Sequence, residues 1–74
     1  MNEEIKVLLS DALPMVDFDA EFLFEQLDSL AVVTILTLLS QKYSLPLSAN
    51  DATPKNLISL DALVRMVEAK IQQQ

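Results

Sequence analysis

The chain has 74 residues, 51% of them apolar, and carries a formal net charge of −6. It contains no cysteine, histidine or glycine, which excludes disulfides, thiolate nucleophiles, Ser-His-Asp triads, nearly all zinc sites and glycine-rich phosphate loops. Because a chain this short buries only about 60% of the surface that it exposes when unfolded, its stability must come from apolar packing in one domain, residues 1–74.

The acidic residues are concentrated in the first part of the chain. Residues 1–30 hold eight acids and one base, whereas residues 31–74 hold three acids and four bases. An acidic half repels phosphate backbones, so we expect no nucleic-acid partner and favour a protein partner with a basic patch. A solvated acidic face without any partner explains the same pattern.

The sequence contains no membrane-spanning or secretory signal. No apolar run approaches the roughly 20 residues that cross a bilayer. The first residues, MNEE, are acidic, unlike the basic start of a secretory signal. We therefore expect a cytoplasmic, monomeric protein.

The first predicted helix covers residues 2–13. Asn2 can cap its start, and the early acids Glu3 and Glu4 suit the positive end of the helix dipole. Pro14 ends it, because its ring disfavours helical geometry at the preceding residue. Its apolar positions follow the i, i+3, i+4, i+7 spacing of one helical face: Ile5, Leu8, Leu9 and Ala12.

Residues 15–28 show no helical or strand period and are acidic. We expect a long loop that is pinned to the core by its aromatic side chains, and loops of this length are usually functional. The apolar residues of this segment include Phe18, Phe22, Leu23, Phe24 and Leu27.

The next segment begins as the apolar run LAVVTILTLL, residues 30–39. Its β-branched residues would suit a buried strand. It continues to Tyr43 without a breaker, however, and no second strand is present to pair with it, so we predict a helix of about 15 residues. Leu36 is a candidate for exposure, and the expected core residues are Val33, Ile35, Leu38 and Leu39.

Two further helices are predicted after a polar link. The segment Leu45-Pro46 ends the long helix, and Asn50 in the link SANDAT is a candidate for a left-handed turn. Thr53-Pro54 opens a helix of about one turn. Ser59 caps the last helix, which ends before a frayed tail of three glutamines and carries one apolar stripe: Leu60, Leu63, Val64, Val67 and Ile71. The predicted fold is all-α, with three long helices and one short one.

Ser29 is the main candidate for a functional residue. If Asp28 is the N-cap, Ser29 occupies the first helical position with its hydroxyl pointing outward. A phosphate attached there would meet unpaired backbone N–H groups and the positive end of the dipole. The alternative is that Asp28 and Ser29 are only a capping pair. A domain this small has little room for a substrate pocket, and we expect neither enzymatic activity nor a metal site.

Several segments in a fixed order resemble the acyl carrier protein family over nearly the whole chain. Asp28-Ser29-Leu30 opens the second helix, which ends in an aromatic residue followed by an apolar segment, Tyr43 to Leu47. A short third helix and a serine-capped fourth helix, beginning Ser59-Leu60, complete the pattern. The resemblance implies a four-helix bundle with a long loop between its first two helices.

The resemblance also implies a function. Ser29 would receive 4′-phosphopantetheine from coenzyme A through a phosphopantetheinyl transferase, and the terminal thiol would carry acyl groups as thioesters. Asp28 and Leu30 would be recognised by that transferase, and Leu30 would also pack at the helix start and support the loop. Further partners would be an acyl-loading ligase or synthase and ketosynthase or acyltransferase enzymes of a fatty-acid-like, polyketide or other specialised lipid pathway. If the core opens to hold an acyl chain, Met15 and Met66 are candidates to line that space, and ordinary packing is the alternative.

The chain departs from the family pattern in two places. Many family members have glycine just before the Asp-Ser pair, where this chain has Leu27. Typical fatty-acid carriers present glutamates along the second helix, whereas no acid occurs here between Leu30 and Asn50. We infer apolar docking and a specialised pathway. A peptidyl or aminoacyl carrier and a non-catalytic helical interaction module remain as alternatives.

Overall fold

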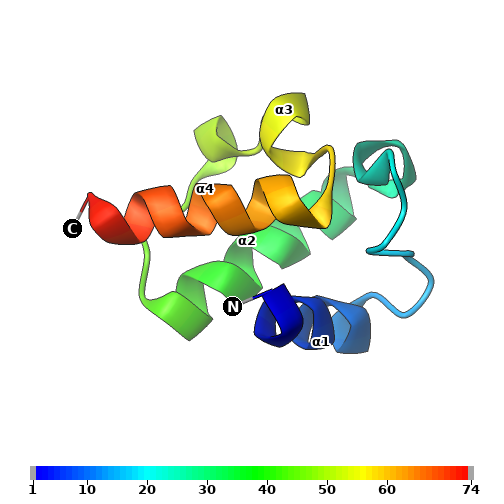
Figure 1. Ribbon diagram of the computed structural model, residues 1–74, viewed down its shortest axis with the longest axis horizontal. Coiled ribbons are helices and arrows are strands. Elements are labelled where there is room, and N and C mark those ends of the chain that lie inside the picture. The colour runs from blue at the N-terminus through cyan, green and yellow to red at the C-terminus, as the bar shows by residue number, and fades with distance from the viewer. Residues whose placement is uncertain (1, 74) are drawn as a thin grey trace.

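The structure, a computed structural model, describes residues 2–73 and is all-helical over them (Figure 1). The predicted all-α class is therefore confirmed, and the segment that resembled a strand is a helix. Three of the α-helices are long and one has four residues, as predicted. Two short 3₁₀ helices, η1 and η2, were not predicted. In chain order the elements are α1 (Asn2–Ala12), η1 (Leu23–Gln26), α2 (Ser29–Tyr43), η2 (Ala49–Asp51), α3 (Pro54–Leu57) and α4 (Leu60–Gln72).

The helices enclose one hydrophobic cluster. α1 packs against both α2 and α4, and α3 packs against α4 and η1. The loop from α1 to α2 runs around one end of the molecule (Figure 1). Eight side chains are fully buried in this cluster: Ile5, Leu9, Leu23, Ile35, Leu39, Leu57, Leu63 and Val67.

α2 is rotated about its axis so that two of its residues are not buried or exposed as predicted. Ile35 and Leu39 are buried and Leu38 is partly buried, as expected. Val33 is 57% exposed and Leu36 only 9% exposed, so both of those expectations are wrong. Side chains four residues apart share a face, and since positions 35 and 39 face the core, position 33 is turned toward solvent.

The first helix ends one residue earlier than predicted, at Ala12, and Ala12 itself is exposed. Ile5 and Leu9 carry the buried face. Asn2 lies inside the helix, so the prediction that it caps the helix is wrong. Its side-chain amide instead donates a hydrogen bond of 3.2 Å to Asp61 at the start of α4.

The connection between α1 and α2 is held in place by a few polar contacts as well as by apolar side chains. Gln26 accepts a hydrogen bond from the backbone N–H of Asp17 (2.8 Å) and donates one to its carbonyl (3.1 Å). The N–H of Leu23 donates to the carbonyl of Ile58 (2.8 Å), which joins η1 to the α3–α4 corner. Phe18 is buried as predicted, but Phe22 and Phe24 are exposed, so only part of the aromatic anchoring is confirmed.

Two predicted capping residues are confirmed, and the residue predicted for a left-handed turn is wrong. Thr53 and Ser59 accept hydrogen bonds from Asn56 N (3.1 Å) and Ala62 N (3.1 Å), which confirms both predicted N-caps. The left-handed residue is Ser44 (φ 53°), which ends α2, and the prediction of Asn50 is wrong because Asn50 lies in η2.

The end of α4 was predicted only in part. Ile71 is 38% exposed, so the apolar stripe of α4 is buried only as far as Val67. Of the glutamines expected to fray, Gln72 is helical and Gln73 forms the C-cap, while Gln74 lies outside the described residues.

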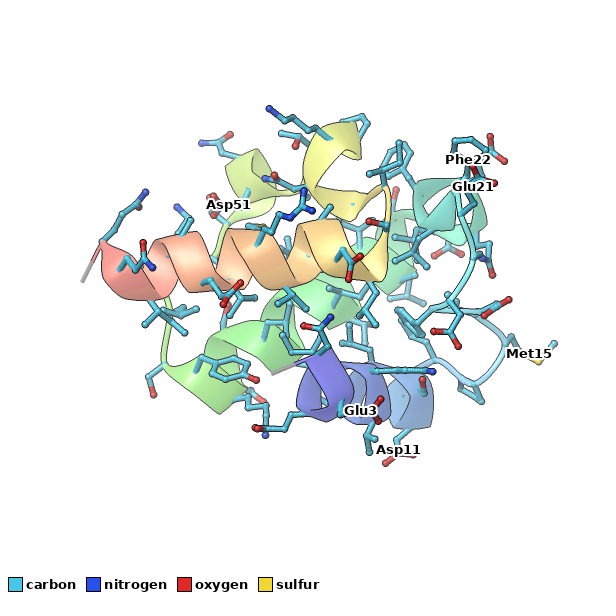
Figure 2. The ribbon with its side chains drawn as sticks, in the orientation of Figure 1. Glu3, Asp11, Met15, Glu21, Phe22 and Asp51 are labelled. Carbon is cyan, nitrogen blue, oxygen red and sulfur yellow. The ribbon has the colours of Figure 1, made fainter. Side chains whose placement is uncertain are left out.

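Asp51 connects three elements of the structure. Its carboxylate accepts a hydrogen bond from Ser48 N (3.0 Å) in a capping box. The same carboxylate forms a 2.9 Å ion pair with Lys70 of α4. Figure 2 shows Asp51 beside α4. Its carbonyl accepts from the Asn56 side chain (2.9 Å). The Ser48 N–H, with the Lys70 ammonium, holds the pKa of the Asp51 carboxyl below its ordinary value.

We expect Asp51→Asn to lower the free energy of unfolding by about 1 kcal/mol at neutral pH. Because the folded-state pKa of Asp51 is depressed, its contribution is present above the ordinary value of 3.8 and is lost as pH falls through the folded pKa. The difference between wild type and variant in urea unfolding should therefore shrink in acid. Asp11→Asn, on the exposed surface of α1, is the control. A difference that is constant with pH would contradict the role of this carboxylate.

Tyr43, the last residue of α2, has a buried hydroxyl with no hydrogen-bond partner among residues 2–73. Burial raises the pKa of its phenol above the ordinary value, and the Glu4 carboxylate raises it further. The Lys42 ammonium lies 5.7 Å from the ring centroid, a contact that phenylalanine can also make.

Tyr43→Phe should raise the free energy of unfolding by about 1 kcal/mol, because it removes an unpaired buried hydroxyl and keeps the ring. Thermal unfolding followed by circular dichroism measures the change. A loss of stability would mean that the hydroxyl is hydrogen-bonded in the folded protein.

Candidate functional site

The candidate site is the start of α2, where Asp28, Ser29 and Leu30 are all exposed. Asp28 has extended backbone geometry, and its Oδ1 accepts a hydrogen bond from Ala31 N (2.8 Å). Its carbonyl accepts the first intrahelical bond, from Val32 N (3.0 Å). Asp28 is thus the N-cap and Ser29 the first helical residue, which confirms their predicted positions.

The local geometry leaves room for an anion on Ser29. The first N–H groups of a helix have no intrahelical acceptor, and Asp28 occupies the one on Ala31. Those of Ser29 and Leu30 remain at the positive end of the helix dipole. No acid follows in the first turn of α2, so no second carboxylate opposes a phosphate there. A phosphodiester on the Ser29 hydroxyl therefore fits this site.

Leu30 does not have the packing role expected of it. Its side chain is 74% exposed, so the prediction that it packs at the helix start and supports the loop is wrong. The loop is supported instead by the contacts of Leu23 and Gln26 described above. The carbonyl of Leu30 accepts a hydrogen bond from the Thr34 hydroxyl (2.9 Å), which ties that side chain to the helix backbone.

A shallow groove of about 390 Å³ begins one turn beyond Ser29. α2 contributes apolar side chains, Val33 and Leu36, and two hydroxyl groups, those of Thr37 and Ser40, and no charged side chain lines the groove. Ser29, Val33 and Ser40 fall on one face of α2, because they are spaced by four and seven residues. Sequence reasoning missed this groove, since it placed Val33 in the core. Its lining residues are Val33, Leu36, Thr37, Ser40, Gln41, Leu47, Ser48 and Ala49.

The two methionines proposed to line an acyl space differ in their burial. Met15 is 93% exposed at the outer edge of the loop (Figure 2), so its predicted role in an interior space is wrong. Met66 is buried in the core, so its predicted role stays a prediction, and it also lines the groove between α3 and α4. Neither residue lines the groove that begins at Val33.

Comparisons with known proteins give no family for this chain. No family model matches it, and no curated protein and no solved structure is significantly similar to it. Within residues 2–73, no helix is both long and apolar enough to cross a membrane. No group of three or more acidic side chains in the same range is arranged to hold a metal ion.

Asp28→Ala should lower the free energy of unfolding by about 1 kcal/mol, because it removes the side chain that caps the start of α2. Asp28→Asn keeps an accepting oxygen and should cost less than half as much. Urea denaturation of both variants measures the difference. Equal losses would mean that the carboxylate charge, and not the hydrogen bond to Ala31, stabilises the helix start.

Proposed function

We propose that the protein is an acyl carrier protein with an acyl-carrier-like bundle, in which Ser29 carries 4′-phosphopantetheine. The observation that carries the proposal is the exposed Ser29 hydroxyl on the first turn of a 15-residue helix, directly after the N-cap Asp28. We place the carrier in the cytoplasm and assign it no enzymatic activity of its own.

The attachment step needs little from this chain. The Ser29 oxygen attacks the phosphorus of coenzyme A that bears the pantetheine group, forming a new P–O bond. The bond to the departing adenosine 3′,5′-bisphosphate breaks, and the transferase takes the hydroxyl proton. What Ser29 supplies is an accessible hydroxyl, and the first N–H groups of α2 lie beside the new phosphodiester.

The prosthetic group supplies the thiol that the chain lacks. That thiol forms a thioester with an acyl group, which partner enzymes load and remove. The uncharged groove beside Val33 suits the arm or an apolar cargo, because no charged side chain lines it. It begins about 6 Å along α2 from Ser29, since a helix rises about 1.5 Å per residue.

One observation favours a second candidate, a peptidyl or aminoacyl carrier. The exposed face of α2 has no acid, whereas we expect glutamates there in a typical fatty-acid carrier. Incubation of the phosphopantetheinylated protein with adenylating ligases for fatty acids and for amino acids would separate the two cargo classes.

The proposal is tested by incubating the protein with coenzyme A, Mg²⁺ and a promiscuous phosphopantetheinyl transferase. Intact mass should increase by one phosphopantetheine group in wild type. Ser29→Ala should show no increase, and Ser10→Ala on α1, the matched control, should be modified like wild type. If folded wild-type protein gains no mass, the carrier assignment is wrong and a helical interaction module remains.

A further inference from the structure

The molecule has two basic side chains that its own acids leave unpaired. Within residues 2–73, three ion pairs use Lys6, Lys42 and Lys70. The other two cations, Lys55 and Arg65, take part in none of them. Both line one groove of about 440 Å³ between α3 and α4. Asp61 also lines this groove, so two cations and one acid leave it with a net positive charge.

Several exposed apolar side chains lie on η1, α2 and the α3–α4 corner, and one of them, Ile58, lines the same groove. Of the eight large apolar residues that are exposed, five lie on or next to η1, on the first turns of α2 or at the α3–α4 corner. The bond from Leu23 N to the Ile58 carbonyl (2.8 Å) joins η1 to that corner, and Ile58 also lines the groove. The five are Phe22, Phe24, Leu30, Val33 and Ile58.

The opposite charge lies on the η1 side of these apolar residues. Glu21 and Glu25 flank the exposed Phe22 and Phe24, and neither acid forms an ion pair within the described part of the chain. Figure 2 shows Glu21 beside Phe22 at the upper right of the molecule, whereas Glu3 and Asp11 lie on α1 along its lower edge. α2 itself carries no charged residue from Ser29 to Gln41, and its first charge is Lys42.

We propose that the phosphopantetheinyl transferase docks on a dipolar surface, with Glu21 and Glu25 at one end, Lys55 and Arg65 at the other, and Phe22 and Ile58 between them. This inference rests on the proposed function and names the surface by which Ser29 is reached. The partner it fits has an apolar centre, a basic patch facing η1 and an acidic patch facing the α3–α4 groove. α2 supplies Ser29, Leu30 and Val33 but no charge.

Such a surface orients the partner as well as attracting it. Two complementary charge pairs at opposite ends fix the rotation of the docked enzyme, and misaligned encounters bring like charges together. If net charge alone attracted the transferase, neutralising Lys55 and Arg65 would make the protein more acidic and would speed its capture by a basic enzyme. If the transferase docks on the dipolar surface, the same substitutions remove one of the two charged ends and slow capture.

The test measures the initial rate of phosphopantetheinylation under kcat/KM conditions, at about 20 and about 200 mM salt. Glu21→Gln/Glu25→Gln and Lys55→Gln/Arg65→Gln should each lower the rate about threefold to tenfold at low salt, and by less at high salt. The matched control, Glu3→Gln/Asp11→Asn, removes two acidic charges from α1 and should leave the rate within about twofold of wild type. Circular dichroism establishes that each variant is folded.

The outcomes separate this inference from the proposed function. Complete modification of every variant at long times, with the expected rate differences, supports both. Complete modification with a rate that is unchanged by either pair, or raised by Lys55→Gln/Arg65→Gln, overturns the dipolar surface and leaves the carrier function standing. No modification of wild-type Ser29 overturns the carrier function itself.

Discussion

Burial of one stripe of α2 against α1 determines the rest of the structure. Ala31, Ile35 and Leu39 recur every fourth residue and are buried, and the last two have no exposed surface. With no disulfide and no glycine in the chain, apolar contacts of this kind supply the stabilisation. Because the helix is rigid, the stripe also fixes where the other residues of α2 point. Ser29 and Val33 are turned to solvent by the same rotation that buries Ile35.

The polar contacts that stabilise the fold include one at the candidate site. The Asp51–Lys70 ion pair joins η2 to α4 without any residue of the site, whereas the Asp28 cap directly precedes Ser29. The end of the molecule that contains Ser29 also has an exposed hydroxyl, exposed apolar side chains and unpaired acids. Exposed apolar groups contribute little to the folding energy, and the proposed docking of the transferase would bury several of them.

Sequence reasoning predicted the parts of the fold that depend on local chemistry. α1 and α4 have apolar residues on one face, and Asp28, Thr53 and Ser59 cap helices because their side chains accept from nearby N–H groups. The rotation of α2 was not predictable in this way. Its run from Leu30 to Leu39 is apolar nearly all round, so the pattern does not distinguish the buried face from the exposed one. Val33 and Leu36 were misplaced for that reason, whereas the packing role expected of Leu30 came from the family resemblance.

Features that depend on distant residues were also beyond the sequence. η1 is positioned by the bond from Leu23 to Ile58, 35 residues along the chain, and no local pattern indicates this pairing. The groove beside Val33 and the groove between α3 and α4 form only when separate segments of the chain are packed together, so no local pattern predicts them. Ser29, by contrast, was located correctly at the helix start, because its place follows from its neighbour Asp28 alone.

We infer that Ser29, and no other serine, accepts the phosphopantetheine. The other five differ in setting: Ser10 and Ser40 lie within helices, Ser44 ends α2, and Ser48 and Ser59 are N-caps. Peptide mapping of the modified protein by tandem mass spectrometry distinguishes all six. The phosphopantetheine should be found on the peptide containing Asp28-Ser29-Leu30 and on no other. Modification of a different serine, with Ser29 unmodified, would show that the assignment of Ser29 is wrong.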